Sequence, residues 1–144
     1  MKSGQTLVWI LRIMGSSSLL ALIFVAVPHA WMDSIHSALG MGPLPAEPVV
    51  GYLARSTSAM YALLGGLLWV VSFDLRRYRR ILIYLGAAIT SFGVMLLVVD
   101  WSEGMPLFWT VWEGPFVAVF GLVILFLIRK QQSPGSVGSS RMEG

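Results

Sequence analysis

The sequence predicts an all-α integral membrane protein, a bundle of four membrane-spanning helices with an additional amphipathic helix on the surface. Hydrophobic residues make up 56% of the 144 residues and charged residues 12%, whereas a soluble domain carries roughly 25% charged residues. The mean hydropathy is +0.76, and the charges are bunched between long apolar runs. About 20 apolar residues cross the roughly 30 Å hydrocarbon core. Four runs therefore qualify as spans, at residues 7–27, 49–73, 81–99 and 109–128.

The first run, residues 7–27, has the basic start of a secretory signal peptide, but its apolar stretch exceeds the usual 7–15 residues. We therefore expect a retained helix, in which Arg12 extends its apolar stem toward the cytoplasmic headgroups. The four spans and their loops form one transmembrane domain, residues 1–130. The Ser/Gly-rich remainder, residues 131–144, is predicted to be a disordered cytoplasmic tail.

A different kind of helix is predicted at residues 29–39, between the first two spans. At about 100° per residue, His29, Asp33 and His36 gather on one side of it. This pattern is typical of an amphipathic helix on the outer membrane surface with its polar side in water. The same spacing could present two imidazoles and a carboxylate to one metal ion, although no further ligand is nearby in the sequence. The opposite, apolar side comprises Trp31, Met32, Ile35, Ala38 and Leu39.

The second and third spans carry small residues at close to helical spacing. In lipid, helices associate through close backbone approach and dispersion, because the hydrophobic effect does not press them together. The second span, residues 49–73, is therefore predicted to lie at the centre of the bundle, and the seam of a homodimer is an alternative use of the same residues. The small residues are Ala54, Ser58, Ala62 and Gly66 in the second span and Gly86, Thr90 and Gly93 in the third.

The charged residues predict an orientation. Nine of the ten basic residues lie near the chain start, between the second and third spans, or after the fourth span, and only Arg55 lies on the other side. Five of the seven acidic residues fall on the side of Arg55. The positive-inside rule then predicts a multi-pass protein of the inner (plasma) membrane with both termini in the cytoplasm. The net charge of +3 is accounted for by this orientation, and no nucleic-acid partner is expected.

Arg55 stands about 9–10 Å into the second span, where a guanidinium is costly to bury. Because intramembrane arginines usually face a partner, we expect Arg55 to pair with Glu113 first and with Asp100 second. Tyr52 and Trp112 are predicted to complete this polar cluster. The surface helix is expected to cover the cluster on its outer side. Such a cluster is either a clamp that ties three helices together or a binding site for a small anionic or quinone-like molecule.

The order of these parts resembles that of the small DoxX-like four-helix bacterial membrane proteins and related uncharacterised families. The resemblance covers residues 7–128 and rests on "ARSTSAMYALLGGLLW", a basic turn, and "EGMPLFWTVWEGP". Arg55, Gly104, Pro106 and Glu113 match the pattern of those families. The resemblance implies a helical membrane bundle and, for some members, a link to quinone-related oxidoreductase complexes, but no single activity.

The residues themselves argue against an enzyme. The chain has no cysteine, which excludes thiol–disulfide chemistry, and it has no Gly-rich phosphate loop, G-x-S-x-G or paired-His metalloprotease motif. We expect an accessory or scaffolding subunit of a membrane complex, with the bilayer and other membrane subunits or a second copy as partners. A small transporter, a quinone-related oxidoreductase partner and a membrane enzyme of unknown type are the alternatives, and the cofactor is left open. Against a transporter, no carboxylate falls at the centre of a predicted span.

Overall fold

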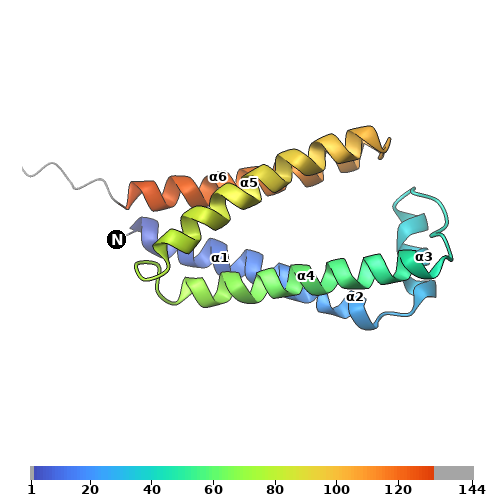
Figure 1. The fold of residues 1–144 in the computed structure, drawn as a ribbon, viewed down its shortest axis with the longest axis horizontal. Helices are drawn as coiled ribbons and strands as arrows, with labels where there is room; N and C mark the ends of the chain where they lie inside the picture. The colour runs from blue at the N-terminus through green and yellow to red at the C-terminus, as the bar shows by residue number, and fades with distance from the viewer. Residues whose placement is uncertain (1, 132–144) are drawn as a thin grey trace, which may run out of the picture.

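The computed structural model describes residues 2–131, which form helices joined by short connections and contain no strand. The predicted disordered tail lies outside the described residues, apart from Gln131. In chain order the helices are α1 (Lys2–Leu20), α2 (Leu22–Ala26), α3 (His29–Ala38), α4 (Pro48–Ser72), α5 (Arg79–Ser102) and α6 (Leu107–Lys130) (Figure 1).

Three segments are long and apolar enough to cross a membrane: Ser3–Ala26, Arg79–Ser102 and Leu107–Lys130. α4 has 25 residues but is not among them. Its first half carries Arg55 together with hydroxyl and small residues, which lower its hydropathy. The structure thus confirms an all-helical chain with three candidate spans, one fewer than the four predicted.

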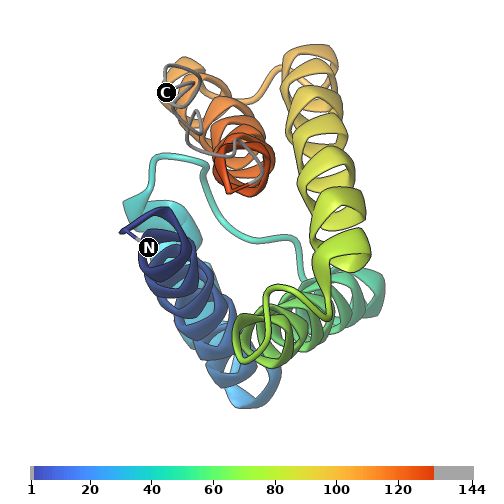
Figure 2. The ribbon, with the colours of Figure 1, turned by 90° about the vertical axis from the view of Figure 1, so that its left-hand side faces the viewer.

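The helices are arranged as two pairs. In the first pair, α1 and its continuation α2 pack along α4; in the second pair, α5 packs along α6 (Figures 1 and 2). The prediction that the second span lies at the centre is wrong, because the main packing partners of α4 are α1 and α2 alone. The two pairs meet in one apolar core where α1 begins and α6 ends. Its buried members are Leu7, Leu11, Leu68, Val71, Leu82, Leu85, Ile89, Ile124, Leu127 and Ile128.

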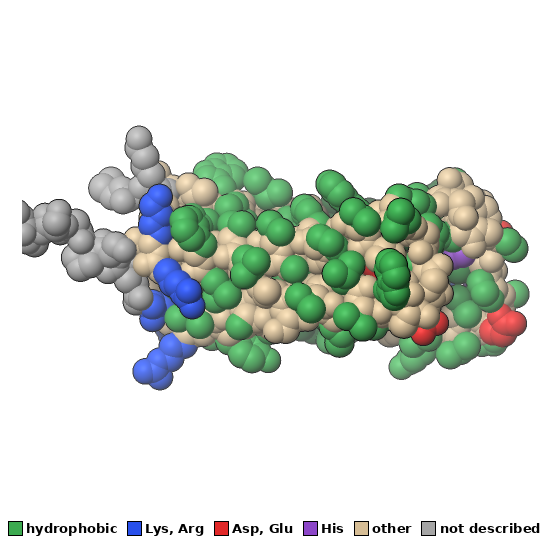
Figure 3. Space-filling view, turned by 90° about the horizontal axis from the view of Figure 1, so that it is seen from above, with side chains coloured by type: hydrophobic (Ala, Val, Ile, Leu, Met, Phe, Trp, Pro, Cys, Tyr) green, Lys and Arg blue, Asp and Glu red, His purple; other side chains and the backbone are tan. Residues whose placement is uncertain are grey.

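Charge separates along the length of the molecule (Figure 3). The basic end comprises the start of α1, the turn between α4 and α5, and the end of α6. Its cations are Arg76, Arg77, Arg79, Arg80, Arg129 and Lys130. The acidic end is the opposite one, with Asp33, Glu47, Asp100, Glu103 and Glu113. The apolar core lies toward the basic end, and toward the acidic end the two pairs move apart (Figure 1).

Glycines bring α5 and α6 into backbone contact. A Cβ atom added to Gly93 would lie 2.6 Å from the carbonyl oxygen of Gly114, and one added to Gly121 would lie 2.6 Å from that of Gly86. No side chain fits at such a distance, so the interface requires glycine. The predicted small-residue face of the third span is therefore confirmed, and the fourth span supplies matching glycines.

The first pair uses a different glycine from the one predicted. A Cβ atom added to Gly65 would lie 2.6 Å from the carbonyl oxygen of Gly15, whereas nothing lies within 4 Å of one added to Gly66. Polar contacts reinforce this interface. Arg12 does not follow the prediction of reaching for headgroups, because its Nε donates to Ser72 Oγ at 3.2 Å and its guanidinium lies over the rings of α4, with Trp69 at 5.1 Å.

The polar side of α3 holds the connection that follows it. The backbone N–H of Leu44 donates to Asp33 Oδ1 at 2.6 Å. His36 Nδ1 donates to the carbonyl of Gly42 at 2.8 Å, and His29 Nε2 donates to that of Pro45 at 3.3 Å. These three side chains are therefore only partly exposed to water, because each also binds the connection, which the prediction did not include. The described residues contain no group of three His, Cys, Asp or Glu side chains able to hold a metal ion.

The predicted helix at residues 29–39 is confirmed almost to the residue. It ends where Gly40 adopts a φ of 78°, a left-handed conformation that glycine accepts without strain. Trp31, Ile35 and Leu39 are exposed, as expected for a side that faces lipid or another protein. The connection then crosses the far end of the molecule, between the helix pairs, to reach α4 (Figure 2).

Candidate functional site

Three apolar cavities lie where the helix pairs separate. One of about 260 Å³ lies between α1 and α6, one of about 540 Å³ between α6 and the end of α3, and one of about 580 Å³ between α3, α4 and Trp109. Phe116 lines the first two, and Leu39 and Trp109 line the last two. Neighbouring cavities share these lining residues, and we call the three cavities together the groove.

One face of α6 forms the wall common to the groove. Residues that line it recur at intervals of three or four, which places them on one side of a helix. They are Trp109, Trp112, Glu113, Phe116, Val117, Val119, Phe120 and Val123. Ile10, Ile13 and Met14 of α1 face the inner part, and the acidic end is lined by α3 and the first half of α4. The groove is therefore apolar over most of its length.

Among the residues that the structure describes, Glu113 is the only acidic one that lines the groove. Trp109, one turn earlier on the same helix, donates its indole N–H to Glu113 Oε2. This bond fixes the carboxylate against the wall and leaves its other oxygen for a second donor.

Asp100 lies behind the groove wall, between α5 and α6. It is 6% exposed, and its Oδ2 has no hydrogen-bond partner in the described part of the chain. The neighbouring buried hydroxyl, Thr110, donates instead to the carbonyl of Pro106 on its own helix. A buried carboxylate oxygen without a donor is costly, which marks this as the least satisfied point of the structure.

The predicted Arg55 clamp does not form. Arg55 is exposed, and its Nη2 donates to the carbonyl oxygen of Val27 at 3.1 Å. No ion pair joins it to Glu113 or Asp100 within the described residues. The reason is topological: α4 pairs with α1 and α2, whereas both acids belong to α5 and α6. Val27 follows the last turn of α2, where a carbonyl lacks a helical donor and a cation is favourable.

The remaining predicted cluster residues are on the outside. Tyr52 is 70% exposed and lines a shallow pocket with Arg55 and Pro48. Trp112 is 71% exposed, and one edge of it reaches the groove while its ring stacks on Phe116 with centroids 5.7 Å apart. The expected cluster of five therefore divides into an Arg55–Tyr52 site on α4 and a Glu113–Asp100 site on α5 and α6.

Sequence reasoning missed Trp109 and Leu39, which link the cavities. The four-residue spacing from Trp109 to Glu113 could have indicated the indole–carboxylate bond, since residues i and i+4 share a helix face. Nothing in the sequence indicated that Leu39 would face α6, because that contact depends on how the connection after α3 folds.

No protein-family model, curated protein or solved structure matches this chain. The groove is therefore the feature of the molecule that bears most directly on function.

Proposed function

We propose that the chain spans the plasma membrane four times, with α4 as a span in addition to the three candidate spans and both termini in the cytoplasm. α4 packs along α1 and α2, which together form one candidate span, and a helix of similar length beside a span can cross the same thickness. The charge separation supports the orientation. Reporters fused after Gly42 and after Arg80 should report opposite sides, with the second one cytoplasmic. Reporters on the same side would exclude α4 as a span.

We further propose that the protein is an accessory subunit of a membrane complex and receives an apolar helix of a partner protein in the groove. The groove itself carries the proposal, because it leaves an apolar face of α6 only partly covered between the two helix pairs, with Trp112, Phe116 and Val119 exposed. A membrane helix gains little by exchanging lipid for apolar side chains alone, so fit and polar contacts decide the association.

Glu113 indicates the chemistry of that partner. A carboxylate with one oxygen free, on an otherwise apolar wall, favours a partner helix that presents a Lys, Arg or amide donor near its outer end.

Purification in mild detergent with matched variants tests this proposal. Val119 lines the groove and Leu122 does not, although both are exposed residues on α6 only three positions apart. We expect a stoichiometric partner to remain with the wild type and with Leu122→Trp, and to be lost with Val119→Trp, whose indole fills the groove. Glu113→Gln should weaken the association. Equal recovery with both tryptophan variants, or a homodimer without a second protein, would contradict the accessory role.

A second candidate function is the binding of a quinone-like molecule in the groove. The cavity beside Trp109 and Glu113 has a volume of about 540 Å³, within the range of small-molecule sites, and combines apolar walls with a fixed polar group. For some DoxX-like proteins, the resemblance also implies a link to quinone-related oxidoreductase complexes. Organic extraction of the purified protein would favour it if an isoprenoid quinone were recovered at a fixed molar ratio that Val119→Trp abolishes and Leu122→Trp does not.

A further inference from the structure

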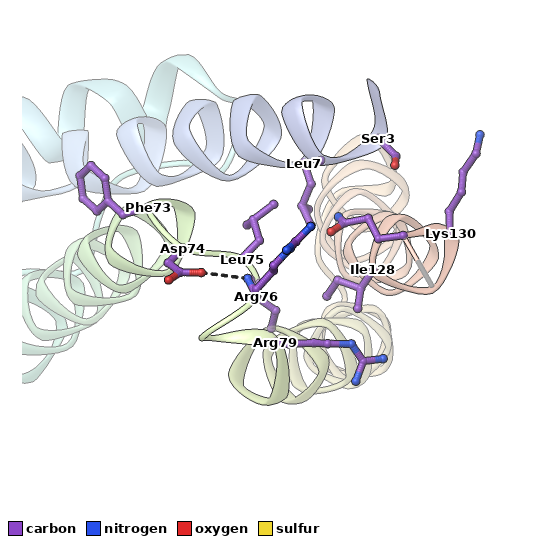
Figure 4. A pocket seen from close by; sticks show the side chains of 12 residues that line it. Ser3, Leu7, Phe73, Asp74, Leu75, Arg76, Arg79, Ile128 and Lys130 are labelled. Carbon is purple, nitrogen blue, oxygen red and sulfur yellow. Dashed lines mark hydrogen bonds between the residues drawn. The ribbon is translucent and has the colours of Figure 1, made fainter. Parts of the chain in front are cut away.

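A cavity of about 640 Å³ opens at the basic end, on the far side of the apolar core from the groove. It lies between the start of α1, the turn after α4 and the last turn of α6 (Figure 4). Its lining residues include Ser3 and Leu7 from α1, Asp74 and Arg76 from the turn, and Lys130 from α6. Three separate parts of the chain thus build one cavity.

The charges around this cavity are unbalanced. Arg76, Arg79 and Lys130 line it, and within the described part of the chain Asp74 is the only acidic residue that does. Asp74 is engaged by the turn itself, since its Oδ1 accepts the backbone N–H groups of Arg76 at 3.1 Å and Arg77 at 2.9 Å. None of the three cations forms an ion pair within the described residues, so their donors are free for an anion.

The side chains are arranged around an apolar floor. Leu7, Leu82 and Ile128, all buried members of the core, line the bottom of the cavity. The Arg76 side chain extends from the turn into the space between Leu7 and Ile128, and Arg79 extends from α5 toward the end of α6, with Lys130 at the rim (Figure 4). The cavity therefore combines guanidinium groups above with hydrocarbon below.

We propose that this cavity binds the phosphate group of an anionic phospholipid, with Arg76 and Arg79 as its main contacts. Guanidinium groups match the geometry of phosphate oxygens, and basic pockets between helices on the cytoplasmic side are suited to anionic headgroups. Phe73 and Leu75, which also line the cavity and are not buried, give the upper part of an acyl chain an apolar surface to contact. The proposal requires the orientation argued above but not the accessory role, because the two sites lie at opposite ends of the molecule.

The test compares two double variants with the same net charge. Arg76→Gln/Arg79→Gln removes both cavity arginines, and Arg77→Gln/Arg80→Gln removes two arginines of the same segment that do not line the cavity. The full-length protein is titrated in detergent with phosphatidylglycerol and with phosphatidylcholine, and binding is measured by native mass spectrometry. A third arm adds inorganic phosphate as a competitor.

We expect the wild type and the Arg77/Arg80 variant to prefer phosphatidylglycerol. The Arg76/Arg79 variant should bind it more weakly by about fivefold per arginine, on the order of 25-fold for the pair. Equal losses in the two double variants would show diffuse attraction to a basic surface and overturn the site. Displacement of the lipid by inorganic phosphate at comparable concentration would show that the acyl chain contributes nothing, which would assign the cavity to free phosphate and overturn the lipid assignment.

Discussion

Arg55 shows how one hydrogen bond can offset part of the free-energy cost of placing a charged residue in an apolar helix. A guanidinium at the centre of a span costs about 2.5–3.5 kcal/mol on insertion scales, and less near an interface. Its contact with the Val27 carbonyl supplies a charged donor to an oxygen that the end of α2 leaves without one. Binding the Val27 carbonyl oxygen requires one N–H donor, whereas a carboxylate would use two donors of the guanidinium at once.

Arg55→Ala should therefore destabilise the protein by about 1–2 kcal/mol, within the lower range for hydrogen bonds to charged groups, because the site is exposed. Arg55→Lys should restore most of this loss, since an ammonium can also donate to one carbonyl. Thermal unfolding in detergent measures both effects.

The double variant Arg55→Ala/Glu113→Ala distinguishes this account from a clamp. The two residues share no partner, so their effects on the free energy of unfolding should add to within about 0.5 kcal/mol. A coupling of several kcal/mol would mean that the two side chains meet in the membrane.

The sequence indicated that Arg55 and the acids lie at the same end of the molecule, and this is correct, because Arg55 binds the Val27 carbonyl just after α2, toward the acidic end. It could not indicate that they belong to different helix pairs. Loop charge determines which end a residue occupies, whereas the neighbour of each helix depends on where backbones approach closely. Two adjacent glycines, Gly65 and Gly66, look equivalent in the sequence, and only one of them touches α1.

At the scale of the helices, these two glycines give a matched prediction. Gly65→Ala should destabilise the α1–α4 interface by about 1–3 kcal/mol, because its Cβ would meet the Gly15 carbonyl and the Leu19 backbone nitrogen, neither of which can turn aside. Gly66→Ala should be neutral or stabilising by up to about 1 kcal/mol, since alanine is favoured over glycine in a helix and has open space there. Thermal unfolding of the two variants checks the order, and equal effects would contradict the interface.

The surface helix was the best-predicted element, and its polar side was the least well understood. Periodicity predicted residues 29–39, and α3 occupies 29–38. The same periodicity could not show that Asp33 and His36 would bind the backbone of the next segment. A polar helix face has the same sequence pattern whether it contacts water or a backbone group. The connection between α3 and α4 is rich in proline and glycine and forms no helix, so backbone groups of Gly42, Leu44 and Pro45 are available to the side chains of α3.

At the scale of the whole molecule, composition and charge predicted the helical class and the two charged ends. They did not predict the open groove. A groove is a relation between two helix pairs, and the residues on its walls are as apolar as residues that face lipid. The central claim is therefore that the two helix pairs share a core toward the basic end and separate toward the acidic end.

Distances between spin labels test that claim most directly, because the chain has no cysteine and each introduced pair is unique. Val70 and Ile83 lie near the basic end of α4 and α5, and Tyr52 and Trp101 lie near the acidic end. Within each helix the two exposed positions are about five turns apart and therefore share a face. Label pairs at 70/83 and 52/101 also have matching offsets along the antiparallel helices. We predict a distinctly longer distance for Tyr52→Cys/Trp101→Cys than for Val70→Cys/Ile83→Cys in lipid nanodiscs. Equal distances would mean a closed bundle without a groove and would contradict the account.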